Sequence, residues 1–252
     1  MSHSEIKRDA VFVADSHVNK KRDNFFEFLK SIDEKRIDTS QLFLMGDIFD
    51  LLVGGVEYTQ KINQKYINLI NKISKKVEIF YFEGNHDFNL KKIFPDIKVF
   101  SYKDQPAVFK MNNYNVLLLH GDKATPFLYT VYTKIIRSKI FLFTISIVDN
   151  FLNGFISKKI IRSQYKKDIC KKIDNFKDIV QTRMAKLLTN DIDIIIEGHF
   201  HQNVTLYIKE DKKYINISSF ACNKSFIIVQ SQSEFQKVKF KKDLPLEKGE
   251  NI

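Results

Sequence analysis

Five short apolar runs, each followed at once by a polar stretch, constrain what this chain can fold into. The runs are Ala10–Ala14, Leu42–Met45, Glu78–Phe82, Val116–Leu119 and Ile192–Ile196. Continuous apolar runs of this length are typical of strands that are buried on both faces. Between the first three runs, apolar residues recur at helical spacing in 22–35 and 58–76. Helices between buried strands predict an α/β protein.

The polar stretches behind these runs hold most of the chain's histidine. They are Asp15-Ser16-His17, Gly46-Asp47-Ile48-Phe49-Asp50, Gly84-Asn85-His86-Asp87, His120-Gly121-Asp122 and Glu197-Gly198-His199-Phe200-His201, and they contain five of the six histidines. In open α/β sheets, ligands bind outside the carboxyl ends of the strands. We therefore expect the five stretches to converge on one site, which places both halves of the chain in one domain.

Seven side chains in these stretches are candidate metal ligands: Asp15, His17, Asp47, Asn85, His120, His199 and His201. Mixed nitrogen and oxygen donors suit first-row divalent ions such as Mn²⁺, Fe²⁺ or Zn²⁺ more than Mg²⁺ or Ca²⁺. Seven ligands exceed what one such ion takes, and they fit two ions roughly 3.5–4 Å apart that share a carboxylate. Asp47 is the candidate bridge because it lies in a Gly-Asp turn at the end of a central strand.

A pair of divalent ions points to hydrolysis. Such a pair lowers the pKa of a shared water and stabilises the charge that develops on phosphoryl oxygens. His86 follows Asn85 and is a candidate catalytic residue, donating a hydrogen bond to a phosphoryl or leaving-group oxygen. Asp50 and Asp87 are candidates for orienting the ligating histidines. The alternative role for Asp50 is that of a helix N-cap.

Taken in this order, the five stretches resemble the signature of the calcineurin-like metallophosphoesterases. The resemblance spans residues 15 to 201. It implies a sandwich of two mixed β-sheets flanked by helices. It assigns Asp15, His17, Asp47 and His201 to one metal ion, and Asp47, Asn85, His120 and His199 to the other. The stretch Asn216-Ile217-Ser218-Ser219 resembles the family's Asn-x-Gly-Ser turn, with its glycine missing.

The segment 123–172 differs from the rest of the chain. It carries eleven Lys or Arg against two Asp, or +9 of the net +11, which leaves +2 elsewhere. Its apolar residues, including the nine-residue run Ile140–Val148, predict a helical lid that covers a cleft or lies on a membrane surface. The run is too short to span a membrane, which takes about 20 residues. The excess of positive charge points to an anionic partner.

A basic helical insertion at this place resembles the lid of the UDP-2,3-diacylglucosamine hydrolases of lipid A synthesis. This resemblance implies cleavage of a lipid-linked nucleotide sugar at its pyrophosphate, giving UMP and 2,3-diacylglucosamine 1-phosphate, with Mn²⁺ as the expected ion. It also implies a cytoplasmic enzyme, peripheral on the anionic inner membrane. Asp122, Arg162 and Lys166 are candidate substrate contacts. Many of those hydrolases carry Arg where this chain has His86.

Two other classes of function are left open. The first is a different metallophosphoesterase, a phosphodiesterase or nuclease, whose basic segment binds nucleic acid. The segment is more aliphatic than such binding needs, so nucleic acid is not the expected partner. The second is a scaffold that keeps the fold and loses metal ligands, although every ligand position is filled here. No feature indicates an obligate protein partner.

Beyond residue 201 the pattern changes to short β-prone segments, which predict an antiparallel meander or hairpins. We expect one domain over 1–245, with the lid at about 123–172, and a loose tail over 246–252. The cysteines, Cys170 and Cys222, lie far apart without C-x-x-C spacing. This argues against a disulfide framework or a cysteine zinc site and fits a reducing compartment, as does the absence of a visible secretory signal.

Overall fold

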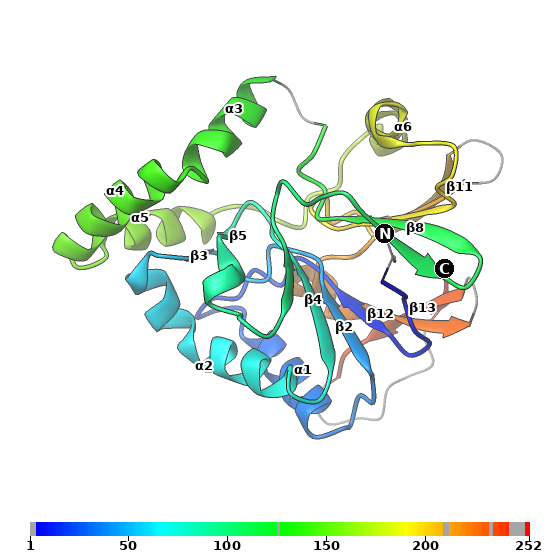
Figure 1. The fold of residues 1–252 in the computed structure, drawn as a ribbon, viewed down its shortest axis with the longest axis horizontal. Coiled ribbons are helices and arrows are strands. Elements are labelled where there is room, and N and C mark those ends of the chain that lie inside the picture. Colours follow the sequence, from blue (N-terminus) through cyan, green and yellow to red (C-terminus); the bar gives the residue numbers. More distant parts are fainter. Residues whose placement is uncertain (1–3, 125–126, 209–211, 232–233, 242–249) are drawn as a thin grey trace.

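The computed structural model describes residues 4–124, 127–208, 212–231, 234–241 and 250–252. Over these residues two mixed β-sheets pack face to face (Figure 1). The larger sheet has the strand order β14-β13-β12-β1-β2-β4-β6. Its strands are β1 (Val11–Val13), β2 (Gln41–Leu44), β4 (Glu78–Phe82), β6 (Lys98–Phe100), β12 (Ser225–Ser231), β13 (Glu234–Lys239) and β14 (Glu250–Asn251). Strands β1, β2, β4 and β6 run parallel, and β12 pairs antiparallel with β1.

The smaller sheet has the order β10-β11-β9-β8-β7. Its strands are β7 (Ala107–Met111), β8 (Tyr114–Leu119), β9 (Ile194–Glu197), β10 (Val204–Ile208) and β11 (Lys212–Asn216). Strands β8, β9 and β11 run parallel to one another. A third, two-stranded sheet joins β3 (Leu52–Val53) to β5 (Asp87–Phe88) beside the candidate site.

Aromatic side chains fill the space between the two large sheets. The parallel register sets Phe12 opposite Phe43, and Phe43 opposite Phe80. Their rings stack in a row, with centroids 4.2 and 4.6 Å apart. Phe109 of the smaller sheet meets Phe43 and Phe80 edge-on. This interior fixes how the two sheets face each other, and so which strand ends lie together.

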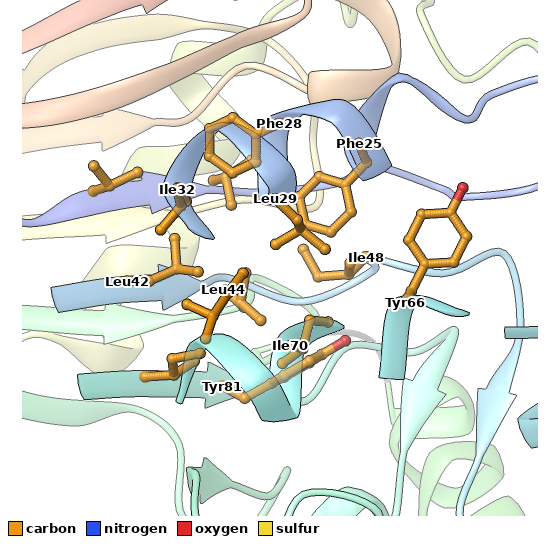
Figure 2. Close-up of a cluster of buried hydrophobic side chains, with 14 of the residues drawn as sticks. Phe25, Phe28, Leu29, Ile32, Leu42, Leu44, Ile48, Tyr66, Ile70 and Tyr81 are labelled. Carbon is orange, nitrogen blue, oxygen red and sulfur yellow. The ribbon is translucent and has the colours of Figure 1, made fainter. Parts of the chain in front are cut away.

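Helices cover the outer faces of the sandwich. Helices α1 (Asn24–Asp33) and α2 (Glu57–Ile73) pack on the larger sheet, and α6 (Phe176–Leu187) packs on the smaller one (Figure 1). In α1, Phe25, Phe28, Leu29 and Ile32 recur at helical spacing and are all buried against β2 and α2 (Figure 2). Burying a side chain of this size contributes about 1.5–3 kcal/mol. The short helices η1 (Leu90–Lys92) and α7 (Phe220–Asn223) complete the connections.

Three more helices form the insertion between β8 and α6: α3 (Phe127–Ile136), α4 (Lys139–Phe151) and α5 (Phe155–Gln164). They project from the sandwich as an arm (Figure 1). The arm rests on a small apolar cluster in which Leu142 meets Val53, Val56 and Phe88. None of the helices described is by itself long and apolar enough to cross a membrane; α4 and α5 pass that test only together, and they are bent by 101°.

The expected fold class is confirmed, with one qualification. The five apolar runs are all strands, but they divide between the sheets: β1, β2 and β4 in one, β8 and β9 in the other. The hairpins predicted after residue 201 are confirmed as β10–β11 and β12–β13, one in each sheet.

The expectation of a loose tail over 246–252 is wrong for its last residues. Glu250 and Asn251 pair with β13, and the Ile252 N–H donates to the Phe235 carbonyl at 2.9 Å. This pairing satisfies backbone groups that would otherwise form an open sheet edge. Residues 246–249 lie outside the described part of the chain.

Candidate metal centre

The loops behind β1, β2, β4, β8 and β9 meet at one end of the sandwich and bring the seven candidate ligands together. Five of the ligands have a positive φ: Asp15 (51°), His17 (42°), Asp47 (50°), His199 (65°) and His201 (58°). A non-glycine residue in this region costs roughly 1–3 kcal/mol, and such strain clusters at functional sites. These strained conformations turn the candidate ligand side chains toward one another, as is common at functional sites.

Two glycines make the close approach possible. A Cβ on Gly46 would lie 2.3 Å from His120 Nδ1, and a Cβ on Gly84 would lie 2.2 Å from Asp47 Oδ1. Gly46 also has a φ of +86°, which side chains rarely adopt. Any larger residue at either position would push a candidate ligand out of place.

One half of the centre joins the first and last stretches of the sequence. His201 Nε2 lies 3.2 Å from Asp15 Oδ1 and 3.4 Å from His17 Nε2. Asp15, His17 and His201 form one group whose ligand atoms all lie within 4.8 Å of one another. Asp47 forms a second such group with His17 and His86.

The other half lies against the end of β8. His120 Nε2 is 3.5 Å from Asp47 Oδ2 and 3.4 Å from Asn85 Oδ1. Asp47, His120 and His199 form a third compact group. Asp47 thus belongs to groups on both sides, the position that a bridging carboxylate requires.

Hydrogen bonds determine which ring nitrogens face the centre. Nδ1 of His120 lies 2.9 Å from the Met45 carbonyl, and Nδ1 of His201 contacts the Ile169 carbonyl. A carbonyl only accepts, so each Nδ1 carries the proton and each neutral ring turns the lone pair of Nε2 inward. That lone pair faces a buried carboxylate oxygen in both halves, and Asp15 Oδ1 has no hydrogen-bond partner. Either a proton on each Nε2 or a metal cation between these atoms reconciles them, and the mixed nitrogen and oxygen donors fit divalent metal ions.

The raised pKa values of His201 and His120 also show that positive charge is stabilised beside the carboxylates. Burial opposes charge on His201, but Asp15 outweighs it and raises the pKa of His201 to about 9. Burial is likewise outweighed at His120, where Asp47 raises the pKa well above 6.5. Burial and the neighbouring His120 lower the pKa of His199 to about 4, which keeps that imidazole neutral.

Asp87 supports the loop of Asp47. Its carboxylate accepts the backbone N–H groups of Asp47 at 3.0 Å, Ile48 at 2.6 Å and Gly84 at 2.9 Å, and the Tyr81 hydroxyl at 2.7 Å. Burial and the charge of Asp47 raise the pKa of Asp87 to about 7. Asp87 therefore holds two ligand-bearing loops together, and in the described part of the chain none of its hydrogen bonds joins it to a histidine ligand.

Asp50 lies behind His17, as expected of a residue that orients a ligand. Its Oδ1 is 3.4 Å from His17 Nδ1, and its carboxylate also accepts Arg22 Nη2 at 2.9 Å and Asn19 Nδ2 at 2.6 Å. The backbone carbonyl of Asp50 lies 2.9 Å from His86 Nδ1. His86 therefore carries a proton on Nδ1, and Nε2 donates only when the ring is a doubly protonated imidazolium.

A cavity of about 480 Å³ opens onto the centre. Besides ligands and His86, it is lined by Tyr129, Gln164, Lys167 and Ile169, all from the insertion or its exit. None of these four was expected from the sequence. Of the predicted substrate contacts, Arg162 lines a neighbouring cavity of about 510 Å³, and Lys166 is exposed and borders neither cavity. The positive charge of 123–172 was the only signal for Lys167.

Asp122, the third predicted contact, is fully buried. Its Oδ2 accepts a hydrogen bond from Arg137 Nη2 at 3.2 Å. The guanidinium of Arg137 lies between the rings of Phe88 and Tyr102, 5.1 and 4.7 Å from their centroids. Arg137, which no motif indicated, thus ties the insertion to the core beside the candidate ligands.

The sequence-based argument against a disulfide is wrong. Cys170 and Cys222 are bonded to each other, with their Cα atoms 5.7 Å apart. Spacing along the chain carried no sign of this pairing because it depends on how the exit of the insertion packs against the loop after β11.

The model of the calcineurin-like phosphoesterase family matches residues 10–203. The chain belongs to this family. The match begins at β1 and ends just beyond His201, so it contains all five histidine- and aspartate-bearing stretches. A calcineurin-like phosphoesterase is a metal-dependent hydrolase, which agrees with the donor set above.

Within this family, the chain is similar to proteins named UDP-2,3-diacylglucosamine hydrolase. The UDP-2,3-diacylglucosamine hydrolase of Vibrio atlanticus is 26% identical over 222 residues, covering 84% of this chain and 83% of its own. That of Wigglesworthia glossinidia brevipalpis is 26% identical over 244 residues, covering 92% and 94%. A solved phosphoesterase from E. coli aligns over 97% of this chain and 98% of its own at 12% identity and a TM-score of 0.48, too distant to add to the assignment.

Proposed function

We propose that this phosphoesterase cleaves the pyrophosphate of UDP-2,3-diacylglucosamine, giving UMP and 2,3-diacylglucosamine 1-phosphate, a step of lipid A biosynthesis. The observation that carries the proposal is the wall of the cavity over the candidate metal centre. Tyr129, Gln164 and Lys167 of the basic, apolar insertion line it opposite His86 and Asp47. Both relatives described above are UDP-2,3-diacylglucosamine hydrolases by name, which supports the choice of substrate.

The seven candidate ligands would hold two divalent ions, Mn²⁺ being our choice with Fe²⁺ or Zn²⁺ as alternatives. Bound there, the ions supply hydroxide near neutral pH and neutralise charge on phosphoryl oxygens. Asp47 contributes to both half-sites. His86, as an imidazolium, donates from Nε2 to the oxygen that leaves when the anhydride bond breaks. Lys167 offers the cation that a second phosphate needs.

The arm of α3, α4 and α5 suits a lipid substrate. Its side chains Ile140, Phe143 and Phe151 are 81%, 69% and 84% exposed. An apolar surface of this kind flanked by Lys and Arg is typical of segments that lie in a membrane interface. We accordingly place the enzyme at the cytoplasmic face of an anionic inner membrane.

The test is UMP release from UDP-2,3-diacylglucosamine in detergent with Mn²⁺. The native chain is compared with His17→Ala and Asp47→Ala, and a soluble phosphodiester, bis(p-nitrophenyl) phosphate, is assayed in parallel. The proposal expects rapid UMP release that both variants lose. Hydrolysis of the soluble diester without UMP release would overturn the lipid substrate and favour a nuclease or phosphodiesterase that uses the +9 segment to bind nucleic acid.

A further inference from the structure

The Cys170–Cys222 disulfide joins two segments that both reach the same half of the metal centre. Cys170 lies in the exit of the insertion, next to Ile169, and Cys222 lies in the short helix α7 after β11. The two cysteines are 52 residues apart in sequence. What each segment contacts shows what the bond holds in place.

The Cys170 segment orients His201. The carbonyl of Ile169 accepts from His201 Nδ1 and thereby directs Nε2 toward Asp15. The next residues are tied to Gln202: the Ile173 N–H donates to Gln202 Oε1 at 2.9 Å, and Lys172 Nζ donates to the Gln202 carbonyl at 2.9 Å. Residues 169–173 thus form a brace along the backbone that carries His201.

The Cys222 segment orients Asp15. The hydroxyl of Ser219 and the N–H of Ala221 both donate to the Asp15 carbonyl, at 2.8 and 3.2 Å, and the N–H of Phe220 donates to the Ala14 carbonyl at 3.0 Å. These bonds hold Asp15 in its left-handed conformation, φ 51°. The disulfide therefore links the support of one candidate ligand to the support of another.

We propose that Cys170 and Cys222 are positioning residues for the half of the metal centre built by Asp15, His17 and His201, and that reduction of their disulfide weakens metal binding there. Losing the Ile169 carbonyl leaves the His201 ring free to turn. Removing the hydrogen-bond partner of a metal ligand typically lowers metal affinity about 10–100-fold. In the other half, the Met45 carbonyl orients the His120 ring, which does not depend on the segments of the two cysteines. The His199 N–H donates to Asp15 Oδ2 at 2.9 Å, so this half meets the braced half through the Asp15 side chain.

The bond is open to exchange because Cys170 is exposed. A dithiol reductant attacks one sulfur as its thiolate and forms a mixed disulfide. The second thiolate of the reductant then attacks the reductant sulfur of this mixed disulfide. That attack closes the reductant's own disulfide and releases the second cysteine, so Cys170 and Cys222 each end as a protonated thiol. In a reducing compartment a disulfide is usually transient and redox-sensing. The proposal rests on the assignment of two metal ions, not on the lipid substrate.

The experiment is a Mn²⁺ titration of the metal-free protein, with free Mn²⁺ measured by electron paramagnetic resonance. Native protein is compared before and after a phosphine reductant, and so is the Cys170→Ser/Cys222→Ser variant. We expect no free thiols before reduction, and two Mn²⁺ sites. After reduction, the Mn²⁺ affinity of one site should fall about 10–100-fold, while that of the other should stay within about twofold. The double variant should bind Mn²⁺ as the reduced native protein does, and the reductant should not change its Mn²⁺ affinity.

A second variant separates this role from general stabilisation. His201→Ala removes a ligand of the braced half, so its remaining site should not respond to reduction. Equal loss of Mn²⁺ affinity at both sites, or a change on reduction at the site that remains in His201→Ala, would show that the disulfide stabilises the fold in general. Either result would overturn the proposal. Two free thiols in the untreated protein, or unchanged binding after reduction, would also overturn it. Because the readout is metal binding, failure to hydrolyse the lipid substrate would leave this result standing.

Discussion

Arg137 Nη2 donates a hydrogen bond to the backbone carbonyl of Gly84 at 2.8 Å. Arg137 directly follows α3 in the insertion, and Gly84 directly precedes the candidate ligand Asn85. The same guanidinium pairs with the buried Asp122, and only 11% of the Arg137 side chain is exposed. One side chain therefore connects the position of the arm to the loop that carries a metal ligand.

Replacing Arg137 by Ala should lower the free energy of unfolding by about 3–5 kcal/mol, because it leaves Asp122 buried without its ion partner. Urea unfolding measures the loss. Lys134→Ala is the matched control, since Lys134 lies three residues earlier, in α3, and is exposed; it should change stability by less than about 0.5 kcal/mol. Equal stability of the two variants would contradict this account of Arg137.

Metal content should distinguish the bridging ligand from a ligand of one half. Asp47→Ala is expected to bind neither ion firmly, because Asp47 belongs to groups on both sides of the centre. His201→Ala is expected to keep about one ion per chain. Elemental analysis of protein dialysed against Mn²⁺ measures both. Removing metal from the native chain with a chelator should abolish hydrolysis, and Mn²⁺ should restore it; a native chain that hydrolyses without metal would refute the two-metal centre.

The candidate centre was predictable because each ligand lies at the end of an apolar run. His17 and His201 are 184 residues apart, yet their Nε2 atoms lie 3.4 Å from each other. His17 follows β1 of the larger sheet and His201 follows β9 of the smaller one, so their contact also requires the same ends of the two sheets to lie together. Because ligand sites form at the carboxyl ends of strands, a local pattern still predicted a distant contact. The division of the strands into two sheets was not visible in that pattern, because each run is buried on both faces in either arrangement.

Contacts made by the insertion could not be predicted in the same way. Lys167 borders the cavity while Lys166 does not, and both belong to one run of basic residues. Only the path of the chain after α5 separates them. The Cys170–Cys222 bond and the Arg137–Gly84 contact likewise depend on how irregular segments pack, for which the sequence has no periodic signal.

Glu78 should make stability depend on pH in the acid range. Burial raises its pKa, but hydrogen bonds from Lys98 and Gln41 outweigh this and place the pKa below the usual 4.5. A lowered pKa means that the stabilisation is complete above pH 4.5 and is lost as pH falls through the lower, folded value. Glu78→Gln should cost up to about 1 kcal/mol at pH 7. The difference from the native chain in urea unfolding should shrink on acidification; a constant difference would contradict it.

The exposed face of α4 should bind lipid. Changing Ile140, Phe143 and Phe151 to Ser should reduce co-sedimentation with vesicles that contain phosphatidylglycerol by at least about tenfold, since each inserted side chain contributes about 1.5–3 kcal/mol. Hydrolysis of bis(p-nitrophenyl) phosphate should stay within about twofold, because these side chains are largely exposed. Tyr207→Ser, at a 67% exposed residue of β10, is the control. Unchanged vesicle binding in the triple variant would remove the membrane role of the arm.

His86 can act either as a proton donor or as a further metal ligand, because it forms a compact group with His17 and Asp47. We expect the donor role, in which Nε2 of the imidazolium faces the substrate while Nδ1 stays bonded to the Asp50 carbonyl. His86→Ala should then lower kcat about 10²–10⁴-fold with both metal ions retained. His86→Gln keeps a hydrogen-bond donor but no transferable proton, so it should recover little of kcat. Loss of one ion from His86→Ala would instead identify His86 as a ligand.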